Sequence, residues 1–340
     1  MTEENVIEET GGRNQPWPVR VAAELAGTFM VCFALYVLAT FGSIIFSLNL
    51  AYIALGTGLA YAAVTFALGG VSGGQFNPAV TVAAMITGAT KLVDGLLYIV
   101  AQVIGASLAG LLTRFLLPVS DSVTAKMWLM TAVNGFDKGS VAYSTLNQYG
   151  LGFSYQQAIA VELVAALIVV GAAMATYGKR SYAPAVGVAY AVGAAMTFPV
   201  TGAALNPARA TGIALAAQGQ GLEVEPSSQL WVFWICPVLA AALATLAIVL
   251  NQMIRSPKAK GDDPSALNAY EATEDAEGEA DETSETEAET AAAAEVEGEG
   301  ETPAGQDEQT EQVASEGVDA GVGDHQADAQ ADADEGVERR

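Results

Sequence analysis

The chain has 340 residues, of which 14 are Lys or Arg and 38 are Asp or Glu, for a net charge of −24 at pH 7. Residues 261–340 hold 27 of the acidic residues and only two basic ones, whereas residues 1–260 are almost neutral. The single histidine, His325, lies in the acidic segment, so the rest of the chain has no histidine for catalysis, metal binding or proton transfer. With no nucleophile–base pair and no cluster of metal ligands, the composition argues against an enzyme and predicts neither cofactor nor metal.

Six apolar runs are long enough to cross a membrane, since a spanning helix needs about 20 residues. They cover residues 21–46, 50–69, 95–117, 158–177, 183–200 and 230–254. Two further apolar runs, 76–86 and 203–217, are too short to span and suit re-entrant segments. The sequence therefore predicts an all-α membrane protein. Cys32 and Cys236 lie inside apolar runs and are expected to be buried free thiols.

Composition divides the chain into three parts. Residues 1–18 form a polar N-terminal segment without the apolar core of a signal peptide, residues 19–256 hold the membrane runs, and residues 257–340 form the acidic tail. The tail has almost no large apolar side chains and cannot offset its chain entropy by burial, so we expect it to be disordered. Its many carboxylates suit hydration in a salt-rich cytoplasm, which favours a halophilic archaeon as the source.

Basic residues predict the orientation of the spans. An even number of spans puts both termini on one side, and that side holds eight Lys or Arg residues against three on the other. Cytoplasmic loops are enriched in Lys and Arg. Both termini, and with them the acidic tail, are therefore predicted to be cytoplasmic in a multi-pass protein of the cell membrane.

The membrane part contains an internal repeat. The segment Gly58-Leu-Ala-Tyr-Ala lies 19 residues before Asn77-Pro-Ala, and Gly187-Val-Ala-Tyr-Ala lies 19 residues before Asn206-Pro-Ala, an offset of 129 residues at both ends. Each half, about 19–117 and 154–254, holds three spans and one short run. Because three is odd, the halves have opposite orientations, and such an inverted repeat predicts a site at the membrane midplane.

Two Asn-Pro-Ala motifs open the short runs. Asn is a favoured N-cap residue and Pro suits the first helical position, so each motif predicts the start of a short helix. The motifs are Asn77-Pro78-Ala79 and Asn206-Pro207-Ala208, the second followed by Arg209. With Glu24 and Glu162 near the start of each half and Trp231-Val-Phe-Trp in the last span, they resemble the aquaporin/glycerol-facilitator (major intrinsic protein) family.

This resemblance implies six spans, two half-helices that meet end to end at the midplane, and passive passage of water and small neutral solutes such as glycerol. The two half-helix N-termini would make the pore centre positive, and Asn77 and Asn206 would offer amide donors to a passing water. Arg209, near the outer mouth, would raise the barrier to cations and protons. The resemblance also implies a homotetramer in lipid, with one pore per subunit and no nucleic-acid partner.

Glu24 and Glu162 admit two interpretations. Carboxylates inside membrane helices can relay protons, so an ion- or proton-coupled transporter on an inverted-repeat fold is the alternative to a passive channel. A buried carboxylate can instead accept hydrogen bonds from the unpaired N–H groups of re-entrant backbone. The matched placement of the two residues in the two halves favours this structural role.

The choice of solute depends on four positions. By the resemblance, the constriction near the outer mouth is formed by Thr57, Ala194, Ala203 and Arg209. Water-selective members usually carry an aromatic residue at the first position and histidine at the second, whereas three small side chains beside one Arg predict a wide opening. Ala210, Ala214 and the Phe233-Trp234 pair point instead to the water branch. Width acts directly on permeation, so we expect water plus small neutral solutes.

Overall fold

The computed structural model describes residues 15–46 and 49–255. These residues belong to the first of the two units into which the chain divides, Met1–Ala259. Most of the predicted N-terminal segment and the whole acidic tail lie outside the described residues, so the disorder of the tail stays a prediction.

Within the described residues, six helical segments are long and apolar enough to cross a membrane. They are α1 (Trp17–Val37) with the π-helical turn η2 (Leu38–Gly42), α3 (Leu50–Ser72), α5 (Leu92–Leu116), α8 (Tyr155–Thr176), α9 (Tyr182–Thr201) and α11 (Leu230–Arg255) with its preceding turn. Two half-helices, α4 (Pro78–Ile86) and α10 (Pro207–Ala217), stand where the short apolar runs were predicted. The all-α fold with six spans is confirmed.

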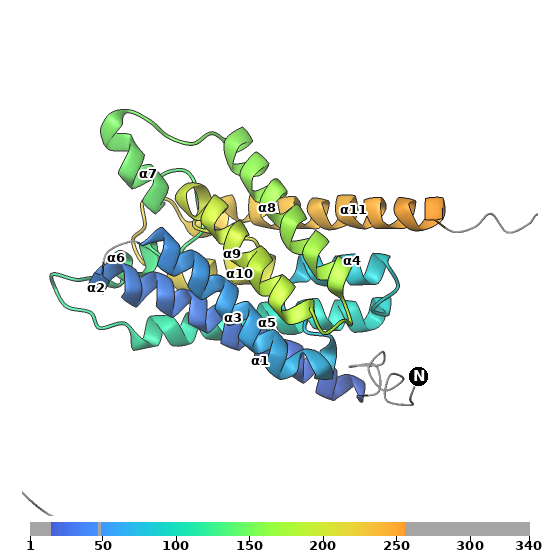
Figure 1. Ribbon diagram of the computed structural model, residues 1–340. Helices are drawn as coiled ribbons and strands as arrows, with labels where there is room; N and C mark the ends of the chain where they lie inside the picture. The colour runs from blue at the N-terminus through green and yellow to red at the C-terminus, as the bar shows by residue number, and fades with distance from the viewer. Residues whose placement is uncertain (1–14, 47–48, 256–340) are drawn as a thin grey trace, which may run out of the picture. The chain divides into compact units, whose positions relative to one another are not determined.

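Shorter elements fill the connections, and apart from α2, which lies within the first predicted run, the sequence analysis did not predict them. They are α2 (Ser43–Phe46), α6 (Ala125–Met130), α7 (Val141–Leu146) and the 3-10 turns η3 (Asn147–Tyr149) and η4 (Pro226–Gln229). Figure 1 shows α6 and α7 at one end of the bundle, and α4 toward the other end, where α1 begins. The free, buried thiols predicted for Cys32 and Cys236 are confirmed.

Polar caps start and stop the long helices. The Asn49 side chain accepts a hydrogen bond from the Tyr52 N–H at 3.0 Å, and Ser154 with Gln157 forms a capping box at the start of α8. Helix α3 is followed by Gly73, whose φ of 99° few other residues adopt at low cost. The apolar length of each run decides that a helix forms in the membrane, and these caps decide where it begins and ends.

The packing follows the inverted repeat. In the first half α1 packs against α3 and α5, and in the second half α8 packs against α9 and α11. Each half-helix crosses over: α4 packs against α11, and α10 packs against α5 (Figure 1). Helices α3 and α9, equivalent in the two halves, pack against each other and form the junction.

Two equivalent glycines bring α3 and α9 together. A Cβ atom on Gly58 would lie 2.4 Å from the carbonyl oxygen of Gly187, and one on Gly187 would lie 2.8 Å from the carbonyl oxygen of Gly58. No side chain fits between these backbones, which is the close approach that small residues permit in membrane helices. The glycine pair therefore sets the spacing of the two helices one turn from Tyr61 and Tyr190.

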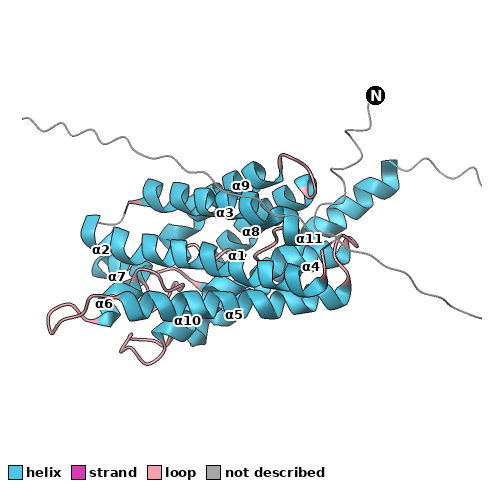
Figure 2. Ribbon diagram, turned by 90° about the horizontal axis from the view of Figure 1, so that it is seen from below, coloured by secondary structure: helices cyan, strands magenta, loops and turns pink. Residues whose placement is uncertain are grey.

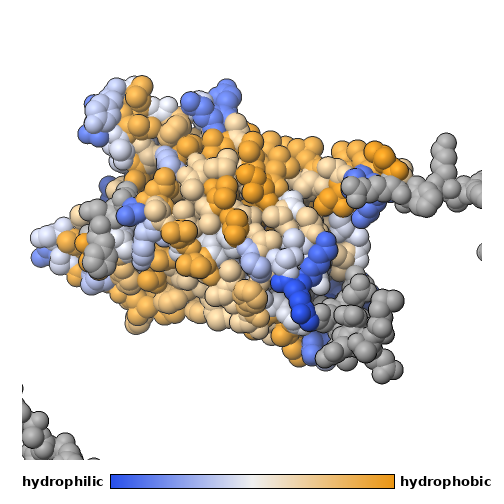
Figure 3. Space-filling view, in the orientation of Figure 1, coloured by the Kyte–Doolittle hydropathy of each residue, from blue (hydrophilic) through white to orange (hydrophobic). Residues whose placement is uncertain are grey.

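The flank of the bundle is apolar. Leu59 and Phe66 on α3 are 69% and 68% exposed, and Phe115 on α5 is 84% exposed. Several long helices run side by side in Figure 2, and in Figure 3 apolar side chains cover this flank while hydrophilic ones gather toward its ends. Exposed apolar surface of this extent is unfavourable in water and suits contact with lipid.

Candidate pore site

Both Asn-Pro-Ala motifs begin a helix, as predicted. The side-chain oxygen of Asn77 accepts from the Ala79 N–H at 2.8 Å, and that of Asn206 accepts from the Ala208 N–H at 2.9 Å. In each case the following proline occupies the first helical turn. Both asparagines are fully buried, so their remaining amide groups must find partners inside the protein or the pore.

The loops before the motifs share an unusual backbone. Phe76 and Leu205, at equivalent positions of the two halves, have φ angles of 47° and 55°. Left-handed backbone is costly for residues other than glycine and persists only where the surroundings hold it. Since the loops do not form regular helix here, their N–H groups need partners from elsewhere in the fold.

In the first half, Glu24 supplies those partners. One carboxylate oxygen accepts from the Ser72 hydroxyl at 2.6 Å and from the Gln75 N–H at 3.0 Å. The other accepts from the Phe76 N–H at 2.7 Å and from the side-chain amide of Gln102 at 2.8 Å. Glu24 is fully buried on α1, so this carboxylate holds the loop from inside the bundle.

In the second half, Glu162 on α8 bonds the equivalent groups. It accepts from the Thr201 hydroxyl, from the Ala204 N–H at 3.3 Å and from the Leu205 N–H at 3.1 Å. These three donors are the repeat equivalents of Ser72 and of the N–H groups of residues 75 and 76. All the described partners of both carboxylates are hydroxyl or N–H donors, and neither carboxylate forms an ion pair with a described residue.

The two half-helices meet at their N-termini. The Asn77 amide nitrogen donates to the Leu205 carbonyl at 3.0 Å, and the Asn206 amide nitrogen donates to the Phe76 carbonyl at 2.8 Å. Each motif is thereby bonded to the loop that precedes the other motif. The positive ends of two helix dipoles therefore converge on one place.

Two tyrosines take the remaining amide donors. The Asn77 amide donates to the Tyr190 hydroxyl at 2.7 Å, and the Asn206 amide donates to the Tyr61 hydroxyl at 2.9 Å. A side-chain amide carries two N–H donors, so both donors of each asparagine are engaged within the protein. Sequence reasoning assigned one of these donors to a passing water. It missed the tyrosines, although both stand inside the repeated Ala-Tyr-Ala segment.

Arg209 lies at the start of α10 and is buried. Its guanidinium donates to the Asn134 side-chain oxygen and to the Gly202 carbonyl, the latter at 3.1 Å. Both partners are neutral, so no described carboxylate pairs with this charge. Asn134, in the connection between the two halves, also donates to the carbonyls of Thr201 and Gly202. It belongs to no motif, and no pattern in the sequence pointed to it.

The other three predicted constriction residues are also buried. Thr57 precedes Tyr61 by four residues on α3, and Ala194 follows Tyr190 by four residues on α9. Four residues are about one helical turn, or roughly 6 Å. Because α9 runs toward Thr201 and the Arg209 end, Thr57 and Ala194 lie one turn beyond the tyrosines on that side. Ala203 lies in the loop whose neighbouring Gly202 carbonyl binds Arg209.

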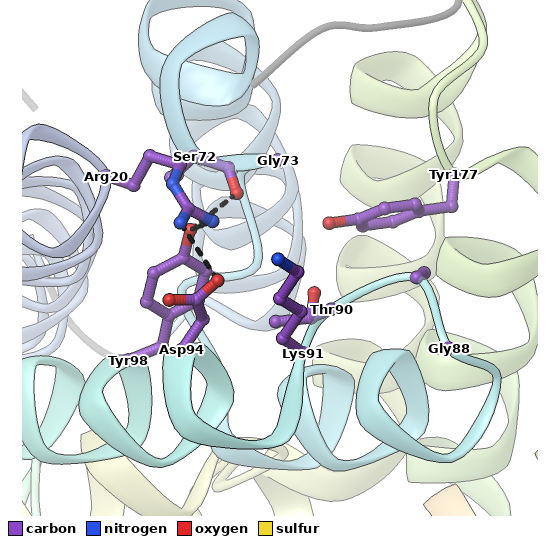
Figure 4. Close-up of a pocket in the computed structure, with 10 residues that line it drawn as sticks. Arg20, Ser72, Gly73, Gly88, Thr90, Lys91, Asp94, Tyr98 and Tyr177 are labelled. Atoms are coloured by element: carbon purple, nitrogen blue, oxygen red, sulfur yellow. Dashed lines mark hydrogen bonds and ion pairs between the residues drawn. The ribbon is translucent and has the colours of Figure 1, made fainter. Parts of the chain in front are cut away.

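At the opposite end, a cavity of about 320 Å³ opens beside the first loop. Figure 4 shows Arg20 beside Asp94 and Tyr98 on one side, with Lys91 and Tyr177 on the other. Gln75 contacts two residues that line the cavity. Its side-chain amide donates to Thr90 at 2.6 Å and to Tyr177 at 2.8 Å.

Comparison with known proteins agrees with this arrangement. Residues 15–248 match the family model described as major intrinsic protein. The chain is 32% identical over 229 residues to Aquaporin Z of Photorhabdus laumondii subsp. laumondii, covering 65% of this chain and 91% of that protein. It is 30% identical over 237 residues to Aquaporin Z of Brucella melitensis biotype 1, covering 67% of this chain and 95% of that protein.

A solved structure shares the fold. The aquaglyceroporin from Plasmodium falciparum superposes with a TM-score of 0.55 at 20% identity, covering 68% of this chain and 93% of that one. The matched regions span the helical bundle and both Asn-Pro-Ala motifs. This protein therefore belongs to the major intrinsic protein family and is a membrane channel of the aquaporin/glyceroporin type, not an enzyme.

Proposed function

We propose that this channel conducts water and small neutral solutes such as glycerol passively, and that it excludes protons and ions. The observation that carries the proposal is the meeting of the two half-helices, where Asn77 and Asn206 each bond the loop before the other motif. A single file of solute passing this point meets the positive ends of two helices.

Exclusion of ions follows from the charges at the site. Cations and hydronium meet two half-helix N-termini and then Arg209, whose described hydrogen-bond partners are neutral oxygens. Anions gain little from the walls, since most side chains around the loops are apolar and cannot replace a hydration shell. Neutral solutes are not repelled by the positive charge and have no ionic hydration shell to lose.

The small side chains proposed for the outer constriction support a solute range beyond water. Thr57, Ala194 and Ala203 are small, and we propose that they face the pore beside Arg209. The curated relatives are named as aquaporins, which favours water. Glycerol rests on the side-chain sizes alone, because the aquaglyceroporin resembles this chain too distantly in sequence to inform the choice of solute.

We propose a structural role for Glu24 and Glu162. Each bonds two backbone N–H groups of a re-entrant loop, and each is supplied with further hydroxyl or amide donors. A proton relay needs a carboxylate that can exchange partners, whereas these hold several donors at once. This use of the carboxylates favours a passive channel over a coupled transporter.

The setting of the channel is also a proposal. The excess of Lys and Arg on one side favours cytoplasmic termini in the cell membrane, with 19–256 as the channel domain and 257–340 as a solvated tail. Membership of the family favours a homotetramer with one pore per subunit. The acidity of the tail favours a halophilic archaeon as the source.

Stopped-flow swelling of proteoliposomes with water, glycerol and urea gradients tests the proposal. We expect water flux well above that of empty vesicles, measurable glycerol flux, and no dependence of either on membrane potential or on an imposed proton gradient. Flux driven by a proton gradient would support the coupled transporter instead. A channel that passes water and rejects glycerol would restrict the proposal to water.

A further inference from the structure

The feature that the proposed mechanism does not use is a pair of stacked tyrosines at the pore centre. The rings of Tyr61 on α3 and Tyr190 on α9 lie nearly parallel, with an interplanar angle of 4° and centroids 3.3 Å apart. Both side chains are fully buried. The residues are equivalent in the inverted repeat, so the pair lies on its two-fold axis, at the level of the two asparagines.

The stack leaves no passage between the rings. A centroid separation of 3.3 Å is van der Waals contact for two flat rings, well below the usual range of about 4.5–7 Å for aromatic pairs. A water molecule inserted between them would need roughly twice that separation. Helices α3 and α9 are in backbone contact at Gly58 and Gly187, about one turn away, and this contact brings the two rings close to each other.

The hydroxyls of the pair occupy the place of the solute. Each one accepts the second N–H of a motif asparagine, Tyr190 from Asn77 and Tyr61 from Asn206. A permeating water or glycerol hydroxyl needs the same N–H. Solute and tyrosine therefore compete for one donor at each asparagine.

The residues one helical turn from the tyrosines differ from those that the resemblance predicts. Thr57 and Ala194 lie one turn toward Arg209, and both are small, whereas the resemblance leads one to expect an aromatic residue and a histidine there. The bulk in this chain is displaced by four residues along each helix, from 57 to 61 and from 194 to 190. Less side-chain bulk therefore stands at the outer level than at the level of the tyrosines.

We propose, on the basis of the channel function above, that Tyr61 and Tyr190 form the limiting constriction of this pore and decide which solutes pass. The stacked pair is the closed arrangement, and at least one ring turns away for each passage. Each ring that turns frees one N–H of the asparagine bonded to it, Asn77 for Tyr190 and Asn206 for Tyr61. The narrowest point thus lies at the pore centre. The four outer positions do not limit the size of the solute, so small side chains are tolerated there.

Replacement of the rings tests this directly. Tyr61→Ala with Tyr190→Ala, in reconstituted full-length protein, is expected to raise glycerol flux at least tenfold and water flux by a smaller factor. Tenfold corresponds to about 1.4 kcal/mol of barrier. The matched control is Phe115→Leu, which removes an aromatic ring that is 84% exposed on the apolar flank of α5 and is expected to leave both fluxes unchanged.

A second double variant separates the effect of ring volume on flux from the effect of the tyrosine hydrogen bonds. Tyr61→Phe with Tyr190→Phe keeps the stack and the volume, so it folds even where the alanine pair does not. Because it frees both amide donors, water flux is expected to rise severalfold while the glycerol-to-water ratio stays that of the unmodified protein. Size-exclusion profiles of all variants establish that each is folded.

The outcomes divide cleanly. Alanine or phenylalanine variants that fold and conduct water and glycerol as the unmodified protein does would overturn the tyrosine constriction and leave the channel function standing. If neither the unmodified protein nor any folded variant conducts water or glycerol, both the channel function and the tyrosine constriction are overturned. Conduction that appears only when the rings are removed would support the tyrosine constriction and overturn the flux proposed for the unmodified protein.

Discussion

The two re-entrant loops share a backbone but differ in the side chains around them. Equivalent residues turn with positive φ, and equivalent N–H groups bond a buried carboxylate, Glu24 in one half and Glu162 in the other. The first carboxylate has an additional donor, the amide of Gln102. The duplicated part of the site is therefore the scaffold that holds the loops.

The charge of the site is not duplicated. The residue after the first motif is Val80, and its equivalent after the second motif is Arg209, which is held by Asn134 and the Gly202 carbonyl. The first half has a neutral amide side chain at Gln75, and its equivalent in the second half is Ala204. The two loops are therefore held in the same way, but the two ends of the pore differ in charge and in polar side chains.

Loss of a loop carboxylate is expected to have the largest effect. Glu24→Ala strips the partners from two buried backbone N–H groups, and each unpaired buried group costs about 1–3 kcal/mol. We expect Glu24→Ala and Glu162→Ala to give little folded protein, measured as the monodisperse fraction in detergent. Glu24→Gln and Glu162→Gln keep one acceptor oxygen and are expected to fold at reduced thermal stability.

The extra hydrogen-bond donor at Glu24 predicts which of the two Glu→Gln variants is the less stable. Glu24 binds four described donors and Glu162 binds three, so Glu24→Gln is expected to lower the melting temperature more than Glu162→Gln. The reverse order would show that the number of donors does not set the contribution of each carboxylate.

Rebuilding a narrow outer constriction is expected to have the next largest effect. Thr57→Phe with Ala194→His places bulk in both halves at the level next to Arg209. Glycerol flux is expected to fall about tenfold, equivalent to about 1.4 kcal/mol, which overpacking of roughly 1–3 kcal/mol can supply. Water flux should fall much less, so the ratio of the two fluxes in one preparation is the measurement. Equal losses would place these residues against neighbouring helices instead of the pore.

Making the second half resemble the first is expected to weaken exclusion of charge. Arg209→Val removes the one charge that distinguishes the two motifs and leaves the Asn134 oxygen without this donor. We expect a proton leak to appear, followed with a pH-sensitive dye inside vesicles, while urea and glycerol flux change little because the tyrosine pair limits them. Asn134→Ala is the matched variant, because it keeps the charge but removes its anchor, and it should leave the proton leak low.

The smallest expected effect is that of pH. Histidine changes charge near pH 6.5, many members of the family carry it where Gln75 stands, and no histidine occurs between residues 1 and 260. Water flux should be flat between about pH 5 and 8, as measured by swelling at constant osmotic gradient. Gln75→His provides the positive control, with a step near pH 6.5. A step in the unmodified protein would reveal a titrating group elsewhere in the pore.

Much of this architecture could be predicted because it depends on local features. Apolar length predicts each span, Asn followed by Pro predicts each half-helix start, and an odd number of spans per repeat predicts opposite orientation of the halves. The observed half-helices α4 and α10 begin at the prolines of the motifs. Family membership, likewise, follows from motifs that are contiguous in the chain.

Only the tertiary structure decided what the side chains of the site bind. Asn206 and Tyr61 are 145 residues apart, Arg209 and Asn134 are 75 apart, and Glu24 and Gln102 are 78 apart. The sequence determined that asparagines cap the two half-helices, but whether their free N–H groups face water or a tyrosine depends on how α3 and α9 cross. That crossing is set by backbone contact between two glycines, and a contact between residues so far apart has no local pattern by which it can be recognised.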